Sequence, residues 1–304
     1  MSVSITLLPP RPERNPRVID APTLRTVLGL LMIAAVFYLT VCGGLFVWQR
    51  RIIFLNDSAR PDPVLAGVPD VAVRTLRTAD GLDITAWYQP PAKADQPVVL
   101  FFHGNSGNIG HRGGRIAHNA SHGWGTMLPE YRGFGGNPGS PSEEGLTLDA
   151  EAAYAALRAD GIAPERIIIW GESLGTAVAT RLASAHPASA LILEAPFTSM
   201  ADIARSRYPF VPVNLLLKDR FDTLARIGDV TIPLLIIHGD QDKLIPIDMG
   251  RHVFAAATTT NRVFWVAEDA GHNNLVESGA HEAAHRFLDR YTTPAGTRHH
   301  IAQR

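Results

Sequence analysis

The chain has 304 residues, with 28 basic and 29 acidic side chains and a formal net charge of −1 at pH 7. Hydrophobic residues make up 46% of the chain, enough for a packed core, which excludes wholesale disorder. The balanced charge offers no basic footprint for nucleic-acid binding. The one cysteine, Cys42, excludes an intramolecular disulfide, a cysteine zinc site and a CxxC redox centre.

An apolar segment, residues 26–48, lies between Arg25 and Arg50 and contains no charged side chain. As a helix it would rise about 35 Å, enough to cross a hydrocarbon core of about 30 Å. Trp48 stands at its end, where an interfacial aromatic residue belongs. A buried core helix and a cleaved signal peptide are the alternatives, but no small-x-small cleavage site precedes Arg50 and Arg51. The segment therefore predicts an uncleaved single transmembrane helix.

The arginines on either side of this segment bear on its orientation. Four precede it and three follow it closely: Arg11, Arg14, Arg17 and Arg25, then Arg50, Arg51 and Arg60. This count favours a cytoplasmic N-terminus and a domain on the non-cytoplasmic side. Residues 1–25 lack periodicity and are predicted to form a disordered tail, and the polar residues 294–304 a flexible one.

Residues 49–293 are predicted to form one α/β domain. Two runs of alternating polarity, 71–77 and 82–88, are joined by Ala79-Asp80-Gly81 and predict a β-hairpin. Short continuous apolar runs follow at 98–102, 166–170, 190–194, 233–237 and 262–266. Alanine-rich helical patterns separate them at 148–159, 176–185, 248–257 and 281–291. Continuous runs are typical of strands buried on both faces, so the pattern predicts a mostly parallel sheet covered by helices.

Ser173 is the candidate nucleophile. It lies at the centre of a Gly-x-Ser-x-Gly motif that follows a predicted strand and opens a predicted helix. In this context the motif is typical of a sharp turn that needs small residues at Gly171 and Gly175 and exposes the serine hydroxyl. The helix N-terminus offers N–H groups to developing negative charge. A serine that only caps an ordinary helix is the alternative.

A nucleophilic serine needs a base, and the base needs an orienting acid, in the chain order Ser, Asp, His in this architecture. Residues 234–246 form a strand followed by a loop that carries two aspartates. Asp242 lies deeper in the loop and is the candidate acid. Asp240 competes with it but is more typical of a solvated turn, and Glu194, at the end of the preceding strand, is a second competitor.

His272 is the candidate base. It follows Gly271 in a loop just beyond the last strand, which places it on the same sheet edge as the candidate nucleophile and acid. His252, His281 and His285 lie on helical patterns and are more typical of surface or packing positions.

An oxyanion that forms on the substrate needs hydrogen-bond donors held in place. The loop after residues 98–102 is expected to supply the backbone N–H of Asn105, and the residue after the nucleophile, Leu174, the second donor. Each donor of this kind contributes about 3–4 kcal/mol of transition-state stabilisation. His103 and Gly104 are expected to support this loop rather than to take part in the chemistry.

These motifs resemble those of the α/β-hydrolase superfamily of serine hydrolases. More narrowly, the chain resembles the membrane-anchored subgroup related to the yeast bud-emergence protein, which includes protein depalmitoylases and lysophospholipid hydrolases. The matching stretches are residues 49–54, 103–108, 130–145, 171–175, 216–221, 238–242 and 271–273. Glu130 departs from the aspartate that relatives usually carry before Tyr-Arg-Gly, at a position expected to brace a loop. The resemblance implies an α/β-hydrolase fold and catalysis by Ser173, His272 and Asp242.

The cap region, about 195–232, has about 38 residues and is too short for a large multi-helix lid. Because the domain would start close to the bilayer, an acyl chain could reach it directly from the membrane. The expected reaction is hydrolysis of an acyl ester or thioester, with no metal or organic cofactor. The expected partners are this substrate and the lipid bilayer, with no nucleic acid and no obligate protein. A serine peptidase and a catalytically silent binding protein are the alternatives, and the intact triad argues against the latter.

Overall fold

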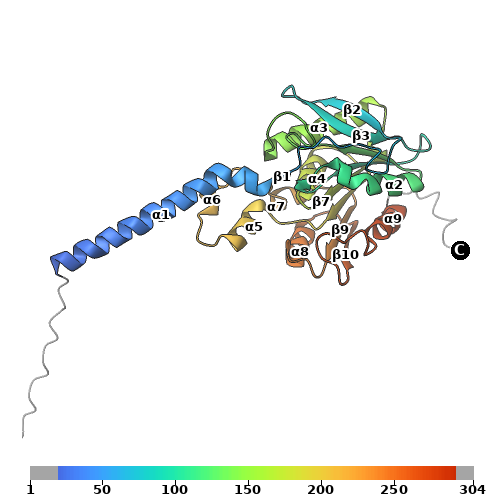
Figure 1. Cartoon of the computed structure of the whole chain (residues 1–304). Helices are drawn as coiled ribbons and strands as arrows, with labels where there is room; N and C mark the ends of the chain where they lie inside the picture. The colour runs from blue at the N-terminus through green and yellow to red at the C-terminus, as the bar shows by residue number, and fades with distance from the viewer. Residues whose placement is uncertain (1–19, 292–304) are drawn as a thin grey trace, which may run out of the picture. The chain divides into compact units, whose positions relative to one another are not determined.

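The computed structural model describes residues 20–291 and divides into two units at Val47. Except for Asp20, the described part of the first unit belongs to helix α1 (Ala21–Ile53), which is blue in Figure 1. By length and composition, α1 is the one helix within residues 20–291 that could cross a membrane. It extends beyond both ends of the predicted segment, 26–48.

The predicted N-terminal tail needs a correction where the structure describes it. Residues 21–25 are helical instead of disordered. Pro22 stands in the first turn of the helix, where a backbone N–H has no intrahelical acceptor and a missing one costs nothing. The rest of that tail, 1–19, and the predicted tail at 294–304 lie outside the described residues.

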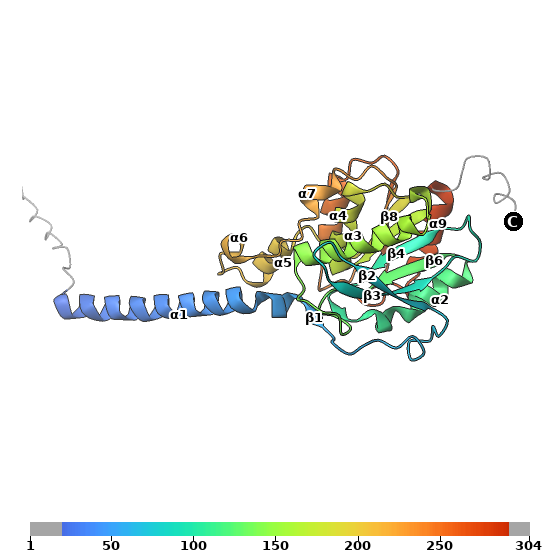
Figure 2. The same cartoon turned by 90° about the horizontal axis from the view of Figure 1, so that it is seen from above.

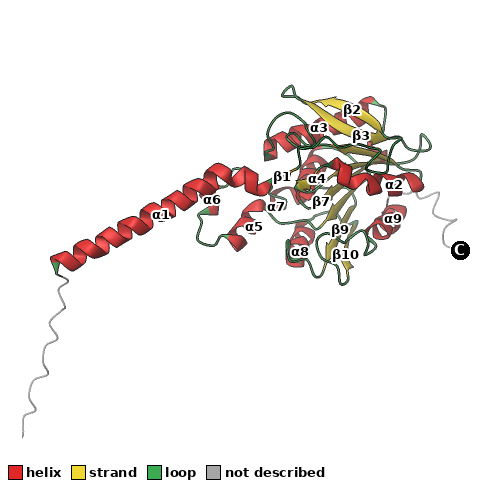
Figure 3. Ribbon diagram, viewed as in Figure 1, coloured by secondary structure: helices red, strands yellow, loops and turns green. Residues whose placement is uncertain are grey.

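The second unit is built on an eight-stranded sheet, shown in yellow in Figure 3. Its strands are β2 (Ala72–Arg77), β3 (Asp83–Gln89), β4 (Val98–Phe102), β6 (Gly125–Pro129), β7 (Ile167–Glu172), β8 (Ala190–Glu194), β9 (Leu234–Gly239) and β10 (Arg262–Ala267). They lie in the order β10-β9-β8-β7-β4-β6-β3-β2. β2 and β3 form the predicted antiparallel hairpin, β3 is antiparallel to β6, and the other pairs are parallel. The predicted α/β fold with a mostly parallel sheet is confirmed.

Helices cover both faces of this sheet (Figure 2). The longer ones are α2 (Gly113–Ser121), α3 (Glu143–Ala159), α4 (Leu174–Ala185), α8 (Ile247–Ala256) and α9 (Ala280–Tyr291). Successive side chains of a strand point to opposite faces, so each apolar run feeds two cores. In β4, Leu100 joins the core beneath α3, α4 and α8, whereas Phe101 joins the core beneath α2 and α9.

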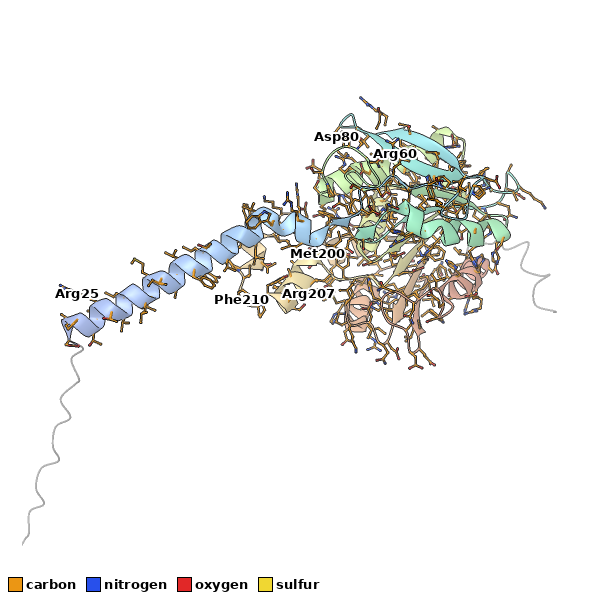
Figure 4. The ribbon with its side chains drawn as sticks, viewed as in Figure 1. Arg25, Arg60, Asp80, Met200, Arg207 and Phe210 are labelled. Carbon is orange, nitrogen blue, oxygen red and sulfur yellow. The ribbon has the colours of Figure 1, made fainter. Side chains whose placement is uncertain are left out.

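The cap consists of three short helices, α5 (Met200–Arg207), α6 (Val213–Leu216) and α7 (Leu224–Ile227). Figure 4 labels Met200, Arg207 and Phe210, which come from this region. The Phe210 side chain is 59% exposed although it is aromatic. The cap therefore presents apolar surface to its surroundings.

Strand β6 was missing from the sequence-based prediction. Its five residues are fully buried, but Gly125 and Pro129 stand at its ends and leave only three central residues to indicate a strand. A small parallel pair, β1 (Leu55–Asn56) with β5 (Ser106–Gly107), was also missed because two-residue strands have no periodicity.

Candidate active site

Ser173 lies at a strained turn between β7 and α4. Its φ is +52° and its ψ is −117°, a conformation that residues with a side chain rarely adopt. A Cβ on Gly171 would lie 2.3 Å from the carbonyl oxygen of Gly175, and one on Gly175 would lie 2.1 Å from that of Phe102. Neither position accepts a larger residue without a backbone shift. The two glycines therefore allow the tight turn at Ser173, although Ser173 is buried and not exposed as the motif predicted.

Ser173, His272 and Asp242 form one hydrogen-bonded series. The His272 Nε2 atom lies 3.0 Å from the Ser173 Oγ atom, and its Nδ1 atom lies 2.7 Å from the Asp242 Oδ2 atom. The serine comes from the turn after β7, the aspartate from the loop after β9 and the histidine from the loop after β10. Parallel strands end at the same sheet edge, which brings together three residues up to 99 positions apart in sequence.

Asp242 is held as a carboxylate acceptor. Its Oδ1 atom accepts hydrogen bonds from the backbone N–H groups of Leu244 and Ile245, each 2.8 Å long. Burial raises the pKa of Asp242, but the hydrogen bonds from His272 and from these backbone groups outweigh burial and hold the pKa below its usual value. The group facing His272 Nδ1 is therefore ionised at neutral pH and accepts the Nδ1–H.

A second buried histidine, His238, fixes the same loop. Its Nε2–H donates to the carbonyl oxygen of Ile245 over 2.8 Å, and burial lowers the pKa of His238. Gly250 of α8 packs against the other side of the ring, since a Cβ there would lie 2.4 Å from His238 Nδ1. By holding Ile245, this ring positions one of the two N–H groups that bind Asp242.

The competing carboxylates are placed differently. Asp240 is exposed in a turn. Glu194 is buried, and its two oxygens accept from both terminal nitrogens of Arg115 at 2.5 and 2.6 Å and from the Trp170 indole at 2.8 Å. Neither carboxylate is hydrogen-bonded to His272, whereas Asp242 is.

The predicted oxyanion donors lie on either side of the nucleophile's turn. Leu174 is the first residue of α4, and among the described residues neither its N–H nor that of Asn105 has a hydrogen-bond partner. The Asn105 side chain donates to the Ile53 carbonyl over 2.8 Å, and the Asn105 carbonyl accepts from the Leu55 N–H over 3.0 Å. These contacts tie the Asn105 loop to the last residue of α1 and to the chain that follows it.

His103 and Gly104 form the base of that loop. His103 Nε2 lies 3.0 Å from a carboxylate oxygen of Glu130, and the other oxygen of Glu130 accepts from the Ile109 N–H over 2.9 Å. A Cβ on Gly104 would lie 3.4 Å from the Cβ of Ser173, so Gly104 packs directly against the nucleophile. Glu130 braces this loop, as the sequence predicted.

Two arginines of the same neighbourhood were not predicted. Arg112 donates to Glu172, the residue before the nucleophile, over 2.7 Å, and Arg115 donates to it over 3.3 Å. Burial raises the pKa of Glu172, but the two guanidinium groups outweigh burial and lower the pKa. Since Arg115 also binds Glu194, it joins the ends of β7 and β8. The arginines stand 57 and 60 positions before Glu172, and no local pattern links them to it.

The remaining predicted histidines lie apart from this series. His252 is exposed on α8. His285 contributes to the group in residues 20–291 that could hold a metal ion, together with His118 and His122. His281 stacks on His118 with ring centroids 4.0 Å apart.

Comparison with known proteins assigns the fold to a class. Residues 97–225 match the family model described as the alpha/beta hydrolase fold. The chain belongs to the α/β hydrolase family, and the resemblance inferred from its motifs is confirmed.

Several known proteins are similar to this chain over most of its length. The chain is 39% identical over 255 residues to an uncharacterized Mycobacterium tuberculosis protein, a match that covers 80% of this chain and 88% of the relative. It is 34% identical over 284 residues to the lysophosphatidylserine lipase ABHD12 of Danio rerio, covering 77% of this chain and 72% of that protein. A Pyrococcus furiosus esterase structure aligns with a TM-score of 0.65 at 17% identity, covering 79% of this chain and 98% of the esterase. At that identity the likeness shows the fold alone.

Proposed function

We propose that the protein is a membrane-anchored serine hydrolase that cleaves ester or thioester bonds of acyl lipids or acylated substrates. The observation that carries the proposal is the hydrogen-bonded series from Ser173 Oγ through His272 to Asp242, at a strained strand-to-helix turn. Such a series activates a serine hydroxyl that is a weak nucleophile by itself.

In the first step, Ser173 Oγ attacks the acyl carbonyl carbon while its proton passes to His272 Nε2. Asp242 holds the His272 ring through Nδ1–H and stabilises the imidazolium that forms. The backbone N–H groups of Leu174 and Asn105 are free to donate to the carbonyl oxygen as it becomes negative. The tetrahedral intermediate collapses when His272 returns its proton to the departing alcohol or thiol, which leaves an acyl group on Ser173.

In the second step, water attacks the acyl carbonyl and gives a proton to His272 Nε2. The second tetrahedral intermediate then breaks its bond to Ser173 Oγ, which recovers its proton from His272. The products are the carboxylic acid and the original enzyme. No group outside the chain and water is needed for this sequence.

Three features support an acylated substrate. The zebrafish relative is named as a lysophosphatidylserine lipase. The cap has short helices, and exposed Phe210 and Leu215 give it apolar surface that suits contact with lipid. Helix α1 is long and apolar enough to anchor the domain at a bilayer.

The excess of arginines before the span supports a catalytic domain on the non-cytoplasmic side. Protease protection of the domain in sealed vesicles would test this orientation.

The test is a hydrolysis panel with the full chain in detergent or vesicles. It compares the turnover of lysophospholipids, fatty acyl thioesters and aminoacyl amides by wild type, by Ser173→Ala and, as a matched control, by Ser206→Ala at an exposed position of α5. We expect turnover of the esters or thioesters by wild type and Ser206→Ala, and none by Ser173→Ala. Turnover of the amides alone would favour a peptidase, and no turnover of any substrate by folded wild type would favour a silent binding protein.

A further inference from the structure

Helices α2 and α9, drawn green and red-orange in Figure 1, carry histidines at matching intervals. His118 and His122 are four positions apart at the end of α2, and His281 and His285 are four positions apart on α9. Residues at this spacing lie on one face of a helix. The pair on α2 faces the pair on α9. The ring of His118 stacks on that of His281 with centroids 4.0 Å apart, and the centroids of His122 and His285 are 3.8 Å apart.

Three of these rings converge on one point. His118, His122 and His285 each bring a ring nitrogen within 4.8 Å of the others. Trp124 stacks on His285 with centroids 4.1 Å apart and holds that ring in place. The cluster therefore combines His118 of α2, His122 directly after α2 and His285 of α9.

The nitrogens of this cluster lack ordinary partners. The Nε2 atoms of His118 and His285 are buried and have no hydrogen-bond partner among the described residues. The Nδ1 atom of His122 lies 3.1 Å from the carbonyl oxygen of His118 and 3.2 Å from Ser121 Oγ, and no described residue hydrogen-bonds its Nε2 atom. A buried polar atom without a partner is destabilising. Two such atoms lie in one cluster of three rings, so a single ligand bound between the rings could satisfy both.

His281 has a different role from the other three. Its Nε2 atom lies 3.5 Å from a terminal nitrogen of Arg115, which donates and has no lone pair to offer. That guanidinium is anchored on Glu194. His281 therefore backs the ring of His118 by stacking and leaves three rings for a ligand.

We propose that His118, His122 and His285 bind a divalent transition-metal ion, with Zn²⁺ as the ion to be tested, outside the hydrolytic site. Neutral imidazole nitrogens are preferred ligands of zinc, and Ca²⁺ and Mg²⁺ prefer oxygen ligands that these three residues do not supply. Zinc commonly takes three protein ligands with a water molecule in the fourth position. The ion would join the end of α2 to α9 and give the buried Nε2 atoms their partner.

The test is a zinc titration of the full chain in detergent after the metal has been stripped with a chelator. A chromophoric zinc indicator competes for the ion and reports affinity and stoichiometry, and Co²⁺ in place of zinc reports imidazole ligation by its visible absorption. His122→Gln is the main variant because His122 is exposed and its loss leaves the core intact. His252→Gln, at an exposed position of α8, is the matched control. The double variant H299Q/H300Q removes the adjacent histidine pair near the C-terminus.

We expect one zinc ion per chain for wild type, with a midpoint of thermal unfolding that rises when zinc is added. Loss of a ligand should weaken binding at least about tenfold in His122→Gln and in His285→Gln, because even outer-shell partners of a metal are worth about 10–100-fold in affinity. Both controls should bind like wild type. The proposal is overturned if wild type binds no zinc, if H118Q/H122Q/H285Q still binds it, or if H299Q/H300Q abolishes binding.

Discussion

The substitution Asp242→Asn isolates the electronic role of the candidate acid. Asparagine keeps an oxygen where Oδ1 accepts the N–H groups of Leu244 and Ile245, so the loop retains both bonds. Its NH₂ group replaces Oδ2, which lies 2.7 Å from His272 Nδ1. Two donors cannot face each other, so His272 must turn Nδ1 into an acceptor and carry its proton on Nε2. That tautomer points an N–H at Ser173 Oγ and cannot remove the serine's proton.

The expected loss in kcat/KM is about 10⁴-fold, which corresponds to about 5.4 kcal/mol of transition-state stabilisation. The assay is hydrolysis of a p-nitrophenyl ester by the full chain, with Asp240→Asn on the exposed turn as the control. Because Asp242→Asn keeps the two backbone bonds, its unfolding midpoint should stay within about 4 °C of wild type. If folded Asp242→Asn keeps more than about a tenth of wild-type activity, His272 is not oriented by Asp242 and the reasoning is refuted.

Three further predictions concern stability. Gly175→Ala would put a Cβ 2.1 Å from the Phe102 carbonyl oxygen and should destabilise by several kcal/mol in chemical denaturation; an unchanged midpoint would contradict the tight turn. Glu130→Gln replaces one carboxylate oxygen with an NH₂ group, so one of the two contacts, to His103 Nε2 or to the Ile109 N–H, is lost. This change should lower the unfolding free energy by about 1–3 kcal/mol without loss of the fold. Burial, followed by the charge of Arg115, lowers the pKa of His281 to about 3, so the folded chain keeps this ring neutral. The contribution of the neutral His281 ring to the free energy of unfolding is complete above the pKa of His281 in the unfolded chain, about 6.5. That contribution is lost as pH falls from about 6.5 towards 3. Calorimetry in chelator should show a midpoint that falls with acid less steeply in His281→Gln; equal slopes would contradict the shift.

Much of the fold follows from local sequence patterns. The continuous apolar runs predicted five of the six parallel strands, because a strand buried on both faces needs apolar residues at every position. Strand β6 was not predicted because glycine and proline border its three central residues. Helix α2 was not predicted because its sequence, Gly113–Ser121, contains two glycines and too few apolar residues to show a helical periodicity.

The candidate site was predictable to the extent that chain order implies position on the sheet edge. Ser173, Asp242 and His272 each follow a recognisable strand, so their meeting could be expected from topology. The links made by Arg115 and the convergence of α2 with α9 could not, because they join helices and strands far apart in sequence. His281 and His285 were predicted to be surface or packing residues, and only the folded chain brings them together with His118 and His122.

The most direct test of serine catalysis is labelling of the full chain with a fluorophosphonate, followed by mass spectrometry of the modified peptide. Fluorophosphonates react with a serine that a neighbouring base has activated. The account predicts one adduct per chain, on Ser173, in wild type and in His252→Ala, and none in Ser173→Ala or His272→Ala. A folded wild type that stays unlabelled, or an adduct that persists without His272, would contradict the account.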